Sequence, residues 1–140
     1  MTGSTLRILI AVILIAHGVG HWMGIATALG AISSDSWNAR SWFFTRVLGD
    51  SAARGIALVL WAAAFIGFIA AGLALFNQLV PPHWWRSLAV VSAAVSMIAI
   101  IFYWNSFAAI FNKAGAVAVN IAALVGLLWL NWPSKTDIGF

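Results

Sequence analysis

The run Leu6-Arg-Ile-Leu-Ile-Ala-Val-Ile-Leu-Ile-Ala-His-Gly-Val-Gly-His-Trp-Met-Gly24 decides the fold, because it is long and apolar enough to cross a lipid bilayer. A helix crosses a hydrocarbon core of about 30 Å with about 20 residues. His17 and His21 lie four residues apart in this run, so a helix places both on one face, about 6 Å apart along its axis. An ionisable side chain inside a membrane is costly and therefore indicates a functional site.

Three more runs of the chain have the length and apolar character of a membrane span. Of 140 residues, 64% are hydrophobic and 7% are charged, whereas a soluble domain carries roughly a quarter charged residues. We therefore predict a single transmembrane domain over residues 1–140, with spans at about 6–29, 52–76, 83–104 and 114–132. Short connections favour antiparallel neighbours. The predicted fold is all-α, an integral membrane four-helix bundle with up-down-up-down topology.

The connection between the first two spans, Trp37–Leu48, is too short and too charged to cross a membrane. Its aromatic and arginine side chains suit a short interfacial helix in the headgroup plane, and an ordered loop packed over the bundle end is the alternative. Indole rings gather at the two boundaries between water and lipid. The layout predicts Trp37, Trp42 and Trp104 at one boundary, and Trp84, Trp85, Trp129 and Trp132 at the other.

Small residues recur at four-residue spacing in every predicted span, and such residues let helix backbones approach closely in a membrane. Each span therefore has a groove for a neighbouring helix. The residues concerned are Ala16, Gly20 and Gly24, then Ala63, Gly67 and Ala71, then Ser92 and Ser96, and last Ala118, Ala122 and Gly126.

Charge and cysteine content exclude several classes of function. The formal net charge is +4, but the seven cations are scattered at the ends of apolar runs. This pattern indicates anchoring to lipid headgroups, and nucleic-acid binding would need a clustered basic patch. The chain has no cysteine, which excludes disulfides, thiolate metal sites and dithiol redox chemistry.

Polar residues of the predicted spans concentrate in the half of the membrane that contains His21. Alternating helix directions bring the start of span two, the end of span three and the start of span four to this depth. A site at this depth would be covered by the Trp37–Leu48 connection, with Asp35 and Asp50 nearby. The predicted ligand-binding residues are His17, His21, Trp22, Arg54, Tyr103 and Asn120.

Each of these side chains also has a purely structural interpretation. The histidines and Asn120 can hydrogen-bond between helices and so hold the spans together. Tyr103 can belong to an aromatic belt, and Arg54 can anchor a helix end by extending its guanidinium to the interface.

Three kinds of ligand can be weighed for the two histidines. A quinone or another lipid-soluble ligand needs one or two hydrogen-bonding groups in an apolar cleft, which His21 and its neighbours supply. A metal ion would find a half-site in His17 and His21 and needs a third ligand, such as Asp35 or Asp50. An intrachain bis-histidine haem is disfavoured, because two histidines on one helix face cannot ligate opposite sides of one iron. The remaining histidine, His83, is predicted at the opposite membrane face.

Several motifs carry a resemblance to small bacterial four-helix membrane proteins and, more broadly, to the DoxX-like group. They are Ala16-His-Gly-Val-Gly-His21, Ser41-Trp-Phe-Phe, the segment Ala53-Arg-Gly-Ile-Ala-Leu-Val-Leu-Trp61, and Ser96 before Phe102-Tyr-Trp104. The resemblance implies the four-span fold and a bacterial inner-membrane location, and some DoxX-like proteins accompany quinone-linked oxidoreductases. No functional residue of that group maps onto a position here. Small multidrug transporters rely on a glutamate, and vitamin K epoxide reductase-like proteins and claudins need cysteines; the chain has neither residue.

The function that these observations favour is a small, non-catalytic membrane protein. It would act as a subunit of a homo-oligomer or of a complex with other membrane subunits, and hold an apolar ligand such as a quinone or lipid near His21. The alternatives are a histidine-dependent redox or metal membrane enzyme, and a dimeric transporter of protons or small molecules.

Overall fold

A computed structural model describes residues 2–34, 37–106 and 110–139 of the chain, and the fold is all-α. The helices, in chain order, are α1 (Gly3–Gly20), α2 (Trp22–Ala28), α3 (Phe44–Leu48), α4 (Asp50–Leu75), η1 (Pro82–Trp84), α5 (Trp85–Phe102), η2 (Trp104–Ser106), α6 (Ile110–Leu124) and η3 (Val125–Trp129).

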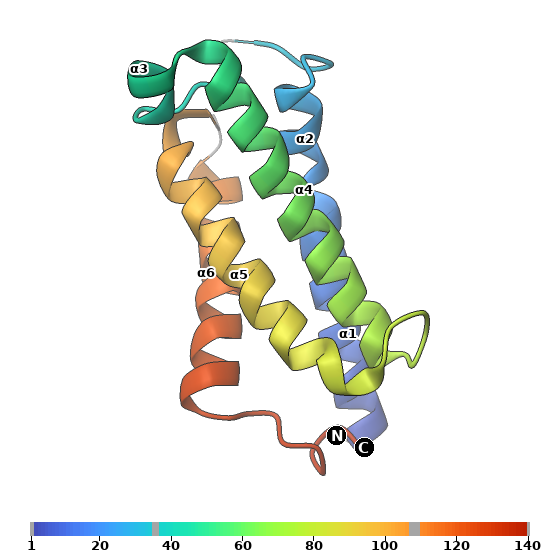
Figure 1. The fold of residues 1–140 in the computed structure, drawn as a ribbon. Helices are drawn as coiled ribbons and strands as arrows, with labels where there is room; N and C mark the ends of the chain where they lie inside the picture. Colours follow the sequence, from blue (N-terminus) through green and yellow to red (C-terminus); the bar gives the residue numbers. More distant parts are fainter. Residues whose placement is uncertain (1, 35–36, 107–109, 140) are drawn as a thin grey trace.

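The long helices alternate in direction, and both termini lie at the same end of the molecule (Figure 1). This confirms the predicted up-down-up-down four-helix bundle. In the described part of the chain, four helical stretches are long and apolar enough to cross a membrane, which fits a multi-pass membrane protein. They are Gly3–Ala28, Asp50–Leu75, Pro82–Phe102 and Asn112–Trp129.

The bundle is open along one seam. α4 packs extensively against both α1 and α5, and α6 packs against α5. In the described part of the chain, α1 and α6 make at most a marginal contact with each other. The last span is also the least buried of the four. The fourth side of the bundle is therefore left open, and the candidate site lies there.

The fourth span ends earlier than the predicted range of 114–132. Its last turn, Val125–Trp129, is a π-helix, in which each hydrogen bond spans one residue more than in an α-helix. Beyond it, Asn131 adopts a left-handed backbone conformation with φ of 50°. The Trp132 N–H then donates to the Gly126 carbonyl at 2.9 Å, which folds the chain back over the helix end.

Only part of the Trp37–Leu48 connection is helical. The short helix α3 covers Phe44–Leu48, so the prediction of a helix over the whole connection is wrong for residues 37–43. Those residues form the ordered loop that was the alternative interpretation.

The loop is held by side chains that bind the end of α5. Ser41 Oγ donates to the Phe102 carbonyl at 2.8 Å and accepts the backbone N–H of Phe44 at 3.0 Å. The Trp42 indole N–H donates to the Ile101 carbonyl at 2.7 Å. The last carbonyls of a helix lack partners within the helix. Here the loop supplies partners for the last carbonyls of α5. Because residues 37–43 are held in this way, they do not extend the short helix α3.

Small residues bring α4 close to its neighbours. A Cβ atom added at Gly67 would collide with Ser92 Oγ of α5, and one added at Gly24 would lie 2.6 Å from Trp61 Cγ of α4. The groove predicted on the last span is different, because Ala118 and Ala122 are exposed. That groove has no neighbour among the described residues.

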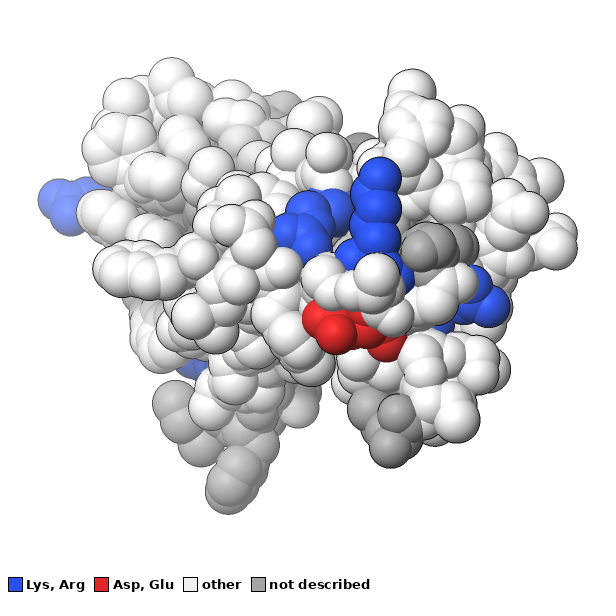
Figure 2. All heavy atoms as spheres, turned by 90° about the horizontal axis from the view of Figure 1, so that it is seen from below, with Lys and Arg blue, Asp and Glu red and all other residues white. Residues whose placement is uncertain are grey.

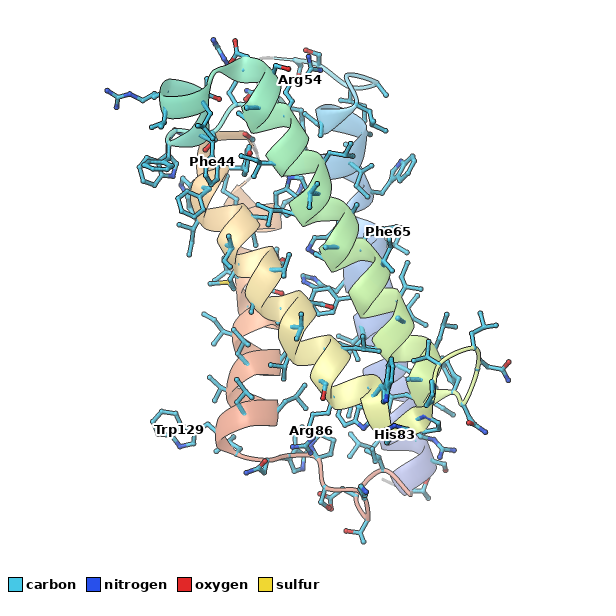
Figure 3. All side chains as sticks on the ribbon, viewed as in Figure 1. Phe44, Arg54, Phe65, His83, Arg86 and Trp129 are labelled. Carbon is cyan, nitrogen blue, oxygen red and sulfur yellow. The ribbon has the colours of Figure 1, made fainter. Side chains whose placement is uncertain are left out.

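Few charged groups are present at the end of the molecule that carries the termini, and most of that surface is uncharged (Figure 2). Arg86 of α5 lies at this end (Figure 3) and binds the segment after η3. One guanidinium nitrogen, Nη1, donates to the Leu127 carbonyl at 3.0 Å and to Asn131 Oδ1 at 3.3 Å. The other, Nη2, donates to the carbonyls of Asn131 and Pro133. Arg86 thus holds the C-terminal segment together with the backbone bond from Trp132 to Gly126.

Replacing Arg86 by methionine is expected to release this segment while the bundle stays folded. The carbonyls that Arg86 binds lie near the molecular end and can turn to water, so we expect a loss of about 1 kcal/mol in global stability. Amide hydrogen exchange should rise at residues 130–139. Arg46→Met is the control, because Arg46 is exposed in α3, which lies at the opposite end of the molecule from the termini (Figure 1). Equal exchange in the two variants would contradict the prediction.

Candidate functional site

The first span is interrupted at His21, and the side chain of that residue explains the interruption. The His21 backbone N–H donates to the Gly18 carbonyl at 3.0 Å, three residues back instead of four. The ring Nδ1–H donates to the His17 carbonyl at 2.8 Å. The imidazole therefore uses the acceptor that the backbone of a regular helix would use. This bond fixes the orientation of the ring, which is only 6% exposed.

Four polar side chains form one hydrogen-bonded network across three helices. His21 Nε2 lies 2.8 Å from Ser96 Oγ of α5. Asn120 of α6 donates from Nδ2 to the same hydroxyl at 2.8 Å, and its Oδ1 lies 3.0 Å from His17 Nε2. Ser96 and Asn120 are fully buried. The network joins α1 to α6 across the seam where the two helices otherwise hardly touch.

The bond directions in this network follow from one obligatory acceptor, the His17 carbonyl. His21 must donate to it from Nδ1, so a neutral His21 has a bare Nε2 that accepts the Ser96 hydroxyl proton. Ser96 then accepts the N–H of Asn120, and Asn120 Oδ1 accepts from His17 Nε2–H. Every bond is satisfied with both imidazoles neutral, as a low-dielectric interior favours.

Aromatic rings surround the two imidazoles. The His17 and His21 rings meet edge to face, with centroids 4.9 Å apart, as their four-residue spacing predicts. His17 also meets the ring of Phe68 edge to face at 4.7 Å, and His21 lies 5.6 Å from the Trp61 ring. Phe68 and Trp61 both belong to α4. These contacts hold the histidines from the side of α4.

A cavity of about 460 Å³ lies between the first span and the start of α6. His17, Gly20 and His21 line it from the first span, and Lys113, Gly115 and Ala116 line it from α6. Trp37 and Trp61 complete its aromatic wall. Ligand pockets are commonly about 300–1,000 Å³, mostly apolar, with a few polar groups. The volume and lining of this cavity suit a small amphiphilic molecule.

The structure brings three of the six predicted ligand-binding residues together, namely His17, His21 and Asn120. Of these three, His17 and His21 line the cavity, whereas Asn120, like the other three predicted residues, does not. Trp22 is 54% exposed and lies near the ring of Phe65, which points from α4 toward the first span (Figure 3).

Arg54 and Tyr103 have other surroundings. Arg54 is exposed at the end of the molecule away from the termini (Figure 3), beside Gly30. Tyr103 is fully buried, and its hydroxyl donates to the Ala53 carbonyl. It therefore joins the end of α5 to the start of α4.

Sequence reasoning did not assign Ser96, Lys113 or Trp61 to the site. The sequence pattern predicts Ser96 as a small packing residue, although a hydroxyl inside an apolar helix is a weak signal for an interhelical bond. Lys113 was treated as a headgroup anchor, and its ammonium lies 4.9 Å from the centroid of the Trp104 ring. For Trp61, no sequence signal indicates that its ring would face the histidines.

The described residues offer few ligands for a metal ion or a haem. They contain no group of three His, Cys, Asp or Glu side chains. Both ring nitrogens of His21 are engaged within the protein, so the pair does not offer two nitrogens to one ion. Asp35 lies outside the described residues, and Asp50 pairs with Arg40 at 3.6 Å on the surface. His83 lies at the end of the molecule that carries the termini (Figure 3).

Comparison with known proteins adds no assignment: no family model, curated protein or solved structure matches the chain. The resemblance to DoxX-like proteins therefore stays a prediction from the motifs.

Proposed function

We propose that this protein is a non-catalytic integral membrane protein that holds an amphiphilic ligand, such as a quinone or lipid, between its first and last spans. The ligand would occupy the cavity beside His17 and His21, with its polar group at the histidines and its apolar part toward the lipid. The open seam between α1 and α6 gives such a molecule lateral access from the bilayer.

One observation carries this proposal: the cavity of about 460 Å³ lies against a hydrogen-bonded histidine network. A network that served only to join helices would not need an adjoining space. A site for catalysis by proton transfer would need a group of altered protonation aimed at the substrate, whereas the hydrogen bonds of this network all form with both histidines neutral.

Filling the cavity is the direct test. Gly20 lines the cavity, and a Cβ atom there would meet nothing within 4 Å, so Gly20→Leu puts an isobutyl group into the ligand space without a backbone clash. We expect the variant to fold and to lose its co-purifying quinone or lipid, measured by native mass spectrometry after mild detergent extraction. We expect a reduction of at least about tenfold, because the side chain and the ligand would compete for the same volume.

Gly55→Leu is the matched control. Gly55 also belongs to a helix, has nothing within 4 Å of an added Cβ, and does not line the cavity. This variant should retain the ligand of the wild-type protein. A wild-type protein that carries no small molecule, or equal retention in both variants, would refute the proposed function.

We further propose that the protein works within a homo-oligomer or with other membrane subunits in a bacterial inner membrane. The exposed small residues Ala118 and Ala122 support an external helix partner, since small residues in membrane helices favour close helix contacts. The resemblance to small bacterial membrane proteins supports the location. Native mass spectrometry of the wild-type protein reports its stoichiometry in the same experiment, and a bare monomer would contradict this part of the proposal.

A further inference from the structure

Among the described residues, one nitrogen of the histidine network has no hydrogen-bond partner. His17 Nε2 is bonded to Asn120, but no hydrogen bond to His17 Nδ1 is found in the described part of the chain. Among the described residues, no buried side-chain nitrogen or oxygen lacks a partner. His17 Nδ1 must therefore be accessible, and the cavity is the space that the His17 side chain lines.

The network determines what this nitrogen can bind. With His17 Nε2–H donating to Asn120, Nδ1 of the neutral ring is a bare acceptor. If the Asn120 amide were turned so that its nitrogen and oxygen exchange places, it would donate to His17 Nε2, and the proton of the neutral His17 ring would then be on Nδ1. In that case Ser96 would have to donate its hydroxyl proton to Asn120 Oδ1. The Ser96 oxygen would face the bare Nε2 of a neutral His21, lone pair to lone pair. That arrangement needs an additional proton on His21, which is unfavourable in an apolar interior.

We propose that the polar head of the ligand is a phenolic hydroxyl that donates to His17 Nδ1, so that the site holds a hydroquinone in preference to the corresponding quinone. This inference rests on the proposed function and specifies its ligand. A quinone presents carbonyl oxygens, which accept hydrogen bonds only, and two acceptors that face each other repel. A hydroquinone presents the hydroxyl donor that the bare His17 Nδ1 can accept. The aromatic wall of Trp37 and Trp61 suits a flat ring.

Among the described residues, Lys113 is the charged group that lines the cavity. Lys113 lines the cavity from α6, whereas His17 lines it from α1. An acidic amphiphile would bind through Lys113, and its binding would not depend on His17 Nδ1. The two chemistries can therefore be separated by substitution at His17.

Three probes with one skeleton test the proposal: 2-decylhydroquinone, its dimethyl ether and 2-decyl-1,4-benzoquinone. Binding is measured by calorimetry in detergent under anaerobic conditions at about pH 8.5, where ordinary imidazoles are neutral. The hydroquinone should bind about tenfold more tightly than the other two, as one hydrogen bond predicts. His17→Phe should remove this preference, and His83→Phe, at the far end of the molecule, should keep it.

The outcomes separate the two proposals. Equal affinity for the three probes, or a preference for the quinone, overturns the hydroquinone inference and leaves the proposed function standing. If none of the probes binds and the wild-type protein carries no small molecule, both proposals are overturned.

The protonation pattern can be tested without any ligand. In protein labelled with ¹⁵N-histidine, His17 should show a protonated Nε2 and a bare Nδ1, and His21 should show the reverse. Adding the hydroquinone should shift the Nδ1 resonance of His17 and leave that of His83 unchanged. A protonated Nδ1 on neutral His17 would overturn the inference directly.

Discussion

Gly24→Ala is expected to lower the free energy of unfolding by about 2–3 kcal/mol, the cost of overpacking a closely packed contact. A Cβ atom at this position would lie 2.6–2.8 Å from three atoms of the Trp61 indole. Trp61 is only 5% exposed, so its ring has little room to move away. The added methyl group therefore forces α2 away from α4. Unfolding by a denaturing detergent, followed by circular dichroism, measures the change.

Gly20→Ala is the control for this prediction. The same methyl group is added one helical turn earlier, where nothing lies within 4 Å of it. We expect stability to be unchanged or to rise by up to about 1 kcal/mol, because alanine favours helix more than glycine does. If both variants lost stability equally, a general effect of glycine replacement would explain the result, and the close packing of α2 on α4 would be refuted.

The architecture could be predicted because a bilayer allows few solutions. Every backbone group in the hydrocarbon must be satisfied internally, so a long apolar run can only be a helix. Four such runs with short connections leave little choice of topology. The Trp37–Leu48 connection was harder to predict, since its hydrogen bonds go to the end of α5, about 60 residues later in the chain.

The sequence predicts the depth of the site residues along the bundle, but it does not predict how each helix is rotated about its own axis. Alternating spans place Asn120, Tyr103 and Arg54 in the same half of the bundle as His21, and this much follows from counting residues. Which way each side chain faces depends on how its helix is turned about its own axis. That rotation is set by packing between helices, so Asn120 reaches His17 while Tyr103 binds the start of α4.

Ser92 and Ser96 illustrate the same limit. They lie four residues apart on one face of α5, and no sequence feature separates their roles. Ser92 Oγ donates to the Leu88 carbonyl of its own helix at 2.6 Å and packs against Gly67. Ser96 reaches His21 and Asn120 instead. The neighbouring helices decide the difference. They place a glycine beside Ser92 and two polar side chains beside Ser96.

Asn120→Leu is expected to destabilise the bundle by about 2 kcal/mol and to abolish ligand retention. The substitution keeps the approximate volume of the side chain but removes both of its hydrogen bonds, to Ser96 and to His17. Each such bond inside a membrane contributes on the order of 1 kcal/mol. The loss also leaves a polar nitrogen of His17 without its partner. Because Asn120 bridges the open seam, α6 would no longer be tied to the first span at the cavity.

Asn105→Leu provides the matched control, because Asn105 is exposed in η2 and lies outside the network; its stability and ligand retention should equal those of the wild-type protein. A double-mutant cycle with His17→Phe then isolates the bond across the seam. If Asn120 acts through His17, the double variant should lose less stability than the sum of the two single variants, because both changes remove the same bond. Strictly additive losses would show that Asn120 holds α6 to α5 through Ser96 alone, and that the seam between α1 and α6 is held by other contacts.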